Sequence, residues 1–169
     1  MTTRVGIALG ANLGRRLTNI REARNVLRDL GGVDSVLLQA PLYMSAPVDC
    51  ADDAPDFFNT VIEIDFSGTP MELLEITQGL ELRLGRDADH GYNAPRVIDV
   101  DILYFGDTVT TEPVLILPHP RMLDRRFVLQ PLNEIRPDLV LPRDAATISE
   151  HYRHLETDEP ELVLMQEAW

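Results

Sequence analysis

The segment VIDVDILYF at residues 97–105 has the strongest β-strand pattern in this 169-residue chain. Side chains two apart on a strand point the same way, so Asp99 and Asp101 share one face while the alternate positions form an apolar row on the other. That apolar row belongs in a core. The two carboxylates lie roughly 7 Å apart along the strand. Like charges are unfavourable there unless screened, which leaves two explanations: a bound divalent cation or a solvated sheet face.

The chain around this strand predicts the element order β-α-β-β-α-β. Strands are expected at residues 4–9, 33–44, 57–66 and 97–105. A first helix is expected between the turn at residues 10–14 and the Gly31-Gly32 pair, because apolar residues recur there every three or four positions. A second helix begins at TPME, residues 69–72, with an N-cap threonine, a proline at the first helical position and a capping-box glutamate. This order is that of the ferredoxin-like split unit, so we expect an α+β fold with an antiparallel sheet and helices packed on one face.

The second helix and the C-terminal part carry further expectations. The inward stripe of the helix should be Leu73, Ile76, Thr77, Leu80 and Leu84. This stripe puts Gln78 and Glu81 on a neighbouring face. A loop at residues 85–95, an edge strand near 108–112 and a short helix near 124–130 should follow. A single domain over residues 1–169 is the default for this length. The tail is expected to be solvated by its acidic residues, which are Glu156, Asp158, Glu159 and Glu161.

The composition excludes several functions. The formal net charge is -13 at pH 7, which opposes a nucleic-acid partner because such partners need Lys and Arg to neutralise phosphates. The 15 basic residues are all arginine, so a P-loop lysine, a Schiff-base lysine and a lysine general base are excluded. Cys50 is the only cysteine, which fits a reducing cytoplasm. No segment has the length of a membrane span or the pattern of a signal peptide.

Basic side chains lie close to the aspartate pair in the sequence. Arg96 directly precedes the strand and Arg86 lies shortly before it, while His119 and Arg125 follow. Guanidinium groups are fork-shaped donors to phosphate oxygens, and Mg²⁺ is commonly bound by one or two carboxylates together with substrate phosphates. Each arginine taken alone reads as a surface residue, but together they favour a magnesium-dependent site that handles phosphate.

Several motifs resemble one enzyme family. APRVIDVDILYFG (residues 94–106) and LPHPRMLDRRFVLQPLNEI (117–135) resemble the signature region of the 6-hydroxymethyl-7,8-dihydropterin pyrophosphokinases. LGANLG (9–14), YMSAPV (43–48), APDFFN (54–59) and QGLELRLGR (78–86) resemble further motifs of that family in the same order. The resemblance covers residues 5–142 and leaves a C-terminal extension at 143–169.

The resemblance implies a folate-biosynthesis enzyme that transfers pyrophosphate from ATP to the hydroxymethyl group of the pterin and releases AMP. It implies two magnesium ions held by Asp99 and Asp101. The residues implied to be catalytic are Arg86, Arg96, Asp99 and Asp101. The residues implied to bind ATP are Gln78, Arg86, Arg96, His119 and Arg125 at the phosphates, Glu81 at the ribose and the backbone of Ile102 at the adenine.

The resemblance also implies a slot for the pterin, with its ring between the aromatic side chains of Phe57 and Phe127. An apolar slot supplies burial, and the amide-like edge of the ring needs polar partners for selectivity. Asn59 offers both donors and acceptors to that edge. The further implied pterin contacts are Ser45, Ala46, Val48 and Asp99.

The chain departs from the family pattern at four positions. Ala88, Tyr92 and Val114 stand where family members commonly carry arginine, and Asn93 stands where they carry a tryptophan that covers the substrate. These departures motivate an alternative hypothesis of a catalytically impaired pterin- or nucleotide-binding homologue, and a structural ferredoxin-like domain is a third reading. We also expect residues 86–95 to form a lid that orders when ATP binds.

Overall fold

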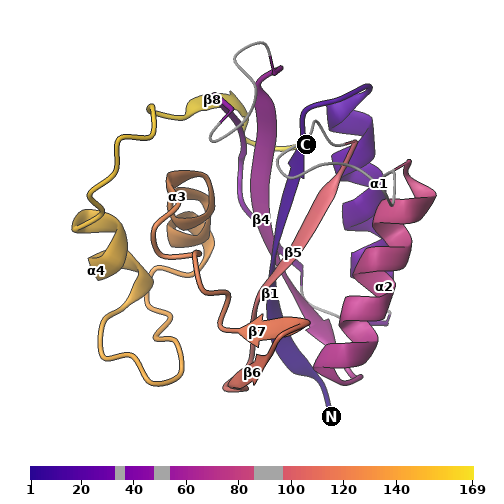
Figure 1. The fold of residues 1–169 in the computed structure, drawn as a ribbon, viewed down its shortest axis with the longest axis vertical. Helices are drawn as coiled ribbons and strands as arrows, with labels where there is room; N and C mark the ends of the chain where they lie inside the picture. Colours follow the sequence, from indigo (N-terminus) through magenta and orange to yellow (C-terminus); the bar gives the residue numbers. More distant parts are fainter. Residues whose placement is uncertain (33–36, 48–53, 86–96) are drawn as a thin grey trace.

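The computed structural model describes residues 1–32, 37–47, 54–85 and 97–169 (Figure 1). Its main feature is a sheet with the strand order β5-β1-β4-β3-β8, in which β2 also pairs with β4. In chain order the elements are β1 (Thr3–Ala11), α1 (Arg16–Asp29), β2 (Leu37–Gln39), β3 (Leu42–Ser45), β4 (Phe57–Phe66), α2 (Pro70–Arg83), β5 (Asp99–Phe105), β6 (Thr110–Glu112), β7 (Leu115–Leu117), α3 (Arg126–Ile135), α4 (Ile148–Arg153) and β8 (Val163–Gln166).

Strand β1 lies at the centre of the topology. It pairs antiparallel with β4 on one side and with β5 on the other. The unit β4-α2-β5 therefore spans β1, and the unit β1-α1-β2 spans β4. This interleaving of two β-α-β units confirms the predicted α+β fold and its antiparallel sheet.

Helices cover both faces of the sheet, which corrects the expectation of a single covered face. Figure 1 shows α1 and α2 on one side of the sheet and α3 and α4 on the other. The α1/α2 side buries a core that includes Ile7, Ile62 and Val100, and the α3/α4 side buries a second core that includes Val61 and Leu129. The reason is the length of α3 and its strongly apolar face, which needs a surface to pack against.

A β-bulge adjusts the central strand pair. Gly6 pairs with Tyr104 and Ile7 pairs with Ile102, so Leu103 is the extra residue on β5. Leu103 and Tyr104 both enter the second core, whereas strict alternation would have sent them to opposite faces. The Tyr104 ring lies directly over Gly6, and its hydroxyl donates to the fully buried Glu63 at 2.5 Å. Arg4 and Arg136 also pair with Glu63, which neutralises this buried carboxylate.

Three elements differ from the sequence-based expectation. The strand expected at residues 33–44 is split into β2 and β3 at Pro41, which has no N–H for a ladder bond, and residues 33–36 lie outside the described part. The edge strand expected near 108–112 is β6, which pairs with β7 in a separate sheet. Helix α3 continues through Pro131 to Ile135, because burial of its apolar face offsets the lost backbone bond.

The start of α2 confirms the predicted capping box. The Thr69 side chain accepts from the backbone N–H of Glu72 at 3.2 Å, and the Glu72 carboxylate accepts from the backbone N–H of Thr69 at 2.6 Å. This backbone hydrogen bond lowers the pKa of the Glu72 carboxyl. The inward face of the helix differs in one respect: Glu81 is buried, with 5% of its surface exposed, and belongs to the inward stripe.

The C-terminal residues fold back onto the sheet, while Glu156, Asp158 and Glu161 of the acidic run are exposed, as expected. Strand β8 pairs with β3, and the Trp169 ring enters the main core, where its Nε1 donates to the Ala40 carbonyl at 2.8 Å. The Arg24 guanidinium lies over this ring, 4.8 Å from its centroid. Among the described residues, none of the helices combines the length and the apolar character needed to cross a membrane.

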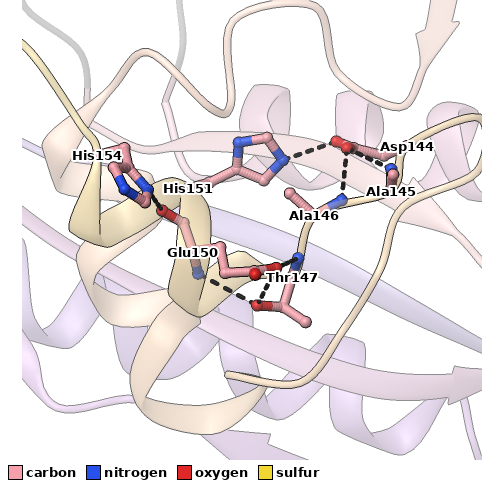
Figure 2. A network of polar contacts seen from close by, with 7 residues as sticks. All are labelled: Asp144, Ala145, Ala146, Thr147, Glu150, His151 and His154. Atoms are coloured by element: carbon pink, nitrogen blue, oxygen red, sulfur yellow. Dashed lines mark hydrogen bonds and ion pairs between the residues drawn. The ribbon is translucent and has the colours of Figure 1, made fainter.

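Helix α4 is held by a local polar network (Figure 2). Thr147 and Glu150 form a second capping box, and the Asp144 carboxylate accepts from the backbone N–H of Ala145 and Ala146. The other oxygen of Asp144 lies 2.7 Å from Nε2 of His151. These hydrogen bonds lower the pKa of Asp144. The buried Ile148 packs α4 into the second core, and the last residues depart from there.

The space around two glycines predicts opposite effects of their substitution by alanine. A Cβ at Gly6 would lie 2.1 Å from Cε1 of Tyr104, whereas a Cβ at Gly79 in α2 would meet nothing within 4 Å. Gly6→Ala should therefore lower the free energy of unfolding by about 1–3 kcal/mol through overpacking. Gly79→Ala should raise it by roughly 0.5–1 kcal/mol through helix propensity. Urea unfolding of both variants checks this, and a Gly6→Ala variant as stable as the parent would contradict the packing described.

Candidate active site

A row of four residues crosses the sheet on the face that carries α3. Asp99 of β5 pairs with Gly10 of β1, Gly10 pairs with Asn59 of β4, and Asn59 pairs with Tyr43 of β3. Directly paired residues place their side chains on the same face. This Asp99–Tyr43 row therefore carries a carboxylate, a glycine without a side chain, an amide and a phenol side by side. Asp99 and Asn59 are separated by one strand, which sets their backbones roughly 10 Å apart.

Gly10 leaves the middle of this row without a side chain. A Cβ at this position would lie 3.2 Å from Oδ1 of Asn59 and 3.8 Å from the ring of Phe57. Because glycine has no side chain, Oδ1 of Asn59 and the Phe57 ring can lie this close to the backbone of β1. The sequence analysis did not single out Gly10 by itself, although its motif LGANLG carried the signal.

The two aspartates occupy the positions expected of them. Asp99 is partly buried and Asp101 is exposed. Asp101 pairs with Ala8, which pairs with Val61, so the row next to the Asp99–Tyr43 row is apolar apart from this carboxylate. The described residues contain no group of three or more His, Cys, Asp or Glu side chains that could hold a metal ion. Two carboxylates alone suit a cation that takes its remaining ligands from water and substrate phosphates.

His119 reaches the same region through a backbone bond to β5. Its N–H donates to the Leu103 carbonyl at 2.7 Å. Its Nδ1 accepts from the backbone N–H of Arg121 at 3.2 Å, so a neutral ring carries its hydrogen on Nε2. Burial is the main cause that lowers the pKa of His119, followed by Arg121, while Asp99 opposes the shift. The ring therefore lies near Asp99 and, in its neutral form, is an Nε2–H donor.

Arg125 lies at the N-cap of α3, and its guanidinium carbon is 5.9 Å from the Phe127 ring centroid. Arg125 also contributes to the lowered pKa of His119, which places these two basic residues near each other. A guanidinium next to the first turn of a helix is a favourable place for an anion. Asp99 and Arg125 thus both lie near His119.

The residues expected at the pterin edge are connected to one another. The Asn59 amide Nδ2 donates to the Ser45 hydroxyl, and both side chains are buried. Ala46 follows Ser45 and is partly exposed, as are Phe57 and Phe127. The Nδ2 of Asn59 is hydrogen-bonded to Ser45, and its Oδ1 lies next to Gly10. Phe127 packs beside the second core at the start of α3.

Tyr43 is a member of the row that the sequence analysis missed. Its hydroxyl donates to the carboxylate of Glu134 on α3. Burial, followed by the hydrogen bond to Glu134, raises the pKa of Tyr43 to about 12. This bond ties α3 to the sheet beside the row. A tyrosine within an apolar strand carries no distinct signal in the sequence.

The outer edge of β5 is covered by Glu81. Its carboxylate accepts from the backbone N–H of Val100 at 2.8 Å. Backbone groups on a strand alternate in direction, so Ile102, two residues further, directs its N–H and C=O to this same edge; its contact with adenine stays a prediction. The Ile102 side chain is buried in the main core, and Gln78 is exposed on α2.

Several predicted site residues lie outside the described residues. These are Val48, Arg86 and Arg96, together with the lid expected at residues 86–95 and the departures at Ala88, Tyr92 and Asn93. Val114, the remaining departure, is 65% exposed between β6 and β7.

Comparison with known proteins identifies close relatives. The model of the 7,8-dihydro-6-hydroxymethylpterin-pyrophosphokinase family matches residues 6–137. The chain is 40% identical to a 2-amino-4-hydroxy-6-hydroxymethyldihydropteridine pyrophosphokinase of Pseudomonas aeruginosa, over 84% of this chain and 86% of that protein. It is 45% identical to the enzyme of the same name from Bacillus subtilis, over 76% of this chain and 75% of that protein.

A similar fold occurs in a solved structure of a longer chain. A Plasmodium falciparum HPPK-DHPS triple mutant, crystallised with pteroate, matches with a TM-score of 0.67 and 16% identity, over 90% of this chain and 43% of that one. At this identity the likeness concerns the fold alone.

The bond between Glu81 and Val100 predicts a cost for losing this carboxylate. Glu81→Ala leaves the buried N–H of Val100 without this acceptor, so we expect the free energy of unfolding to fall by about 1–3 kcal/mol. Glu75→Ala is the matched control, because Glu75 is exposed on the same helix. Guanidinium unfolding measures both variants. Equal stabilities would show that Glu81 does not secure this edge.

Proposed function

Because the chain belongs to the 7,8-dihydro-6-hydroxymethylpterin-pyrophosphokinase family, we propose that the Asp99–Tyr43 row and the basic residues around it form its active centre. The chain is a pyrophosphokinase of folate biosynthesis, with ATP as co-substrate and 6-hydroxymethyl-7,8-dihydropterin as acceptor. Transfer of a pyrophosphoryl group from ATP leaves AMP. The oxygen of the pterin hydroxymethyl group therefore bonds to the β-phosphorus and loses its proton to water. The bond from the β-phosphorus to the oxygen that bridges to the α-phosphate breaks, and AMP leaves with that oxygen.

Asp99 and Asp101 are the proposed ligands of two magnesium ions. The observation that carries this assignment is their common face, one carboxylate partly buried beside Gly10 and the other exposed. Magnesium bound there would neutralise phosphate charge and align the attacking oxygen. The two carboxylates determine where that charge is neutralised. Asp99 lies in the same row as the proposed pterin position, and Asp101 lies in the next row.

His119 and Arg125 are proposed to bind the phosphates together with Arg86, Arg96 and Gln78. The neutral His119 ring offers its Nε2–H to an oxygen, and Arg125 offers a charged fork. Glu81 is proposed for the ribose and the Ile102 backbone for the adenine, supported by their position on the outer edge of β5. In this arrangement ATP lies along β5 with its phosphates toward Asp99.

The pterin is proposed to lie over Gly10, between the rings of Phe57 and Phe127. Asn59, supported by Ser45, would recognise the polar edge of the ring, and Ala46, Val48 and Asp99 would complete the contacts. The missing side chain at Gly10 supports this placement, because no side chain rises from the sheet at the position paired with both Asp99 and Asn59. The hydroxymethyl group would then point toward the aspartates.

The remaining expectations are proposals about the whole chain. We propose that residues 1–169 form one domain including the extension at 143–169, which is supported by Trp169 in the main core. We propose that the enzyme works in the cytoplasm with small-molecule substrates only, without nucleic acid or membrane. The impaired-homologue alternative gains no support from the described site.

The metal assignment predicts the product and the effect of one substitution. With ATP, magnesium and the pterin, the parent chain should form AMP in equal amount to pyrophosphorylated pterin. Asp101→Asn keeps the shape of the side chain but removes its charge, so we expect the rate to fall by about 10²- to 10³-fold. Chromatography of the nucleotide products measures both.

Asp107→Asn is the control, since Asp107 is exposed in the turn that follows β5. It removes the same charge and should keep the parental rate. Formation of ADP by the parent chain would contradict the reaction. A parental rate in Asp101→Asn would contradict the role of this carboxylate.

A further inference from the structure

The segment that joins α4 to β8, residues 154–162, crosses the start of α3. We call it the strap. Its Glu159 carboxylate accepts from the backbone N–H of Arg126 at 2.8 Å through Oε2 and contacts Nη1 of Arg125 at 3.4 Å through Oε1. The Glu159 side chain is only 11% exposed, and that of Arg125 is 20% exposed. The acidic strap was expected to be solvated, so this contact corrects that expectation for Glu159.

The groups that Glu159 binds are those that would otherwise hold a phosphate oxygen. An N–H in the first turn of a helix and an adjacent guanidinium attract anions through the helix dipole and charge-assisted hydrogen bonds. Arg125 is also the residue proposed above to bind the ATP phosphates. A carboxylate of the chain itself therefore lies on a group that the substrate needs.

We propose that the strap is an autoinhibitory segment in which Glu159 competes with the ATP phosphates for Arg125 and the N-terminus of α3. The inference rests on the proposed function of Arg125. ATP must displace the Glu159 carboxylate before Arg125 can contact the phosphates. This competition raises the Michaelis constant for ATP.

Both ends of the strap are anchored, so Glu159 stays near its partners. On one side, the buried Ile148 packs α4 into the second core, and the capping box and the Asp144–His151 pair stabilise its start (Figure 2). On the other side, β8 pairs with β3. Next to Glu159, Glu161 pairs with Arg126 at 3.2 Å. Anchoring raises the effective concentration of the carboxylate, so its two contacts compete more effectively with an anion that binds from solution.

A metal-bound triphosphate can displace Glu159 from Arg125 more easily than a small anion can. ATP engages the aspartates, the outer edge of β5 and the basic residues at once, and those contacts favour its entry over that of one carboxylate. Once Arg125 is released, the strap loses its contact and only its anchored ends remain. Binding of ATP and release of the strap are thus coupled. The coupling free energy by which ATP favours release equals that by which release favours ATP binding.

The first test is Glu159→Gln, which keeps the shape of the side chain and removes its charge. The Michaelis constant for ATP should fall by roughly 3- to 10-fold, the range expected for loss of one charge-assisted contact, with an unchanged kcat. Glu156→Gln is the matched control, because Glu156 lies in the same strap and is exposed. It changes the net charge equally and should leave the Michaelis constant as in the parent.

A merely structural role of Glu159 predicts a different outcome. If Glu159 only anchors the tail or positions Arg125, Glu159→Gln will lower the melting temperature and leave the Michaelis constant for ATP unchanged or raised. Either of these results for the Michaelis constant overturns the proposal.

The second test is independent of turnover. Calorimetry of a non-hydrolysable ATP analogue with magnesium should show tighter binding to Glu159→Gln than to the parent, and Arg125→Ala introduced into both should abolish the difference. A difference that persists without Arg125 overturns the proposal, and so does a parent chain that binds no analogue. If the parent binds the analogue but makes no AMP, the proposed function fails while the strap is still judged by binding. If the parent makes AMP and Glu159→Gln matches it in both tests, the strap inference alone fails.

Discussion

Strand β1 pairs with β5 on one side and β4 on the other, and this double register determines which side chains can meet on the sheet. Asp99, Gly10 and Asn59 fall in one row because of it, and Asp101 falls in the next row beside Ala8. A slip by one residue would send every side chain of β5 to the opposite face, placing the carboxylates in the main core. The register is secured by burial of the apolar face of β5 and by Glu81 at its outer edge.

The two faces of the sheet have different roles, since the proposed site lies on the face that carries α3. The α1/α2 side is the main apolar core, while the α3 side combines the second core with the Asp99–Tyr43 row and the buried, paired Glu63. Helix α3 contributes to both, since Leu129 packs in the second core and the N-terminus of the helix brings Arg125 and Phe127 to the site. The bond between Tyr43 and Glu134 holds α3 in place. The proposed phosphate and pterin contacts on α3 thus depend on packing elsewhere along the same helix.

Local patterns were predictable from the sequence and long-range contacts were not. The strand at residues 57–66, the capping box of α2 and the common face of Asp99 and Asp101 depend on neighbours within a few residues, so periodicity revealed them. The burial of Glu81 depends on the N–H of Val100 on another element, and the fold-back of the tail depends on a space in the core for Trp169. The contact between Glu159 and Arg125 joins residues far apart in the chain, and the family motifs end before it.

The central claim is that one row of the sheet holds the metal-binding carboxylate and the pterin side by side. A crystal structure with magnesium, a non-hydrolysable ATP analogue and the pterin tests it most directly. We expect carboxylate oxygens of Asp99 and Asp101 at about 2.0–2.1 Å from magnesium, with the pterin ring over Gly10 and between Phe57 and Phe127. Metal coordinated away from both aspartates, or a pterin bound elsewhere than over Gly10, would contradict the account.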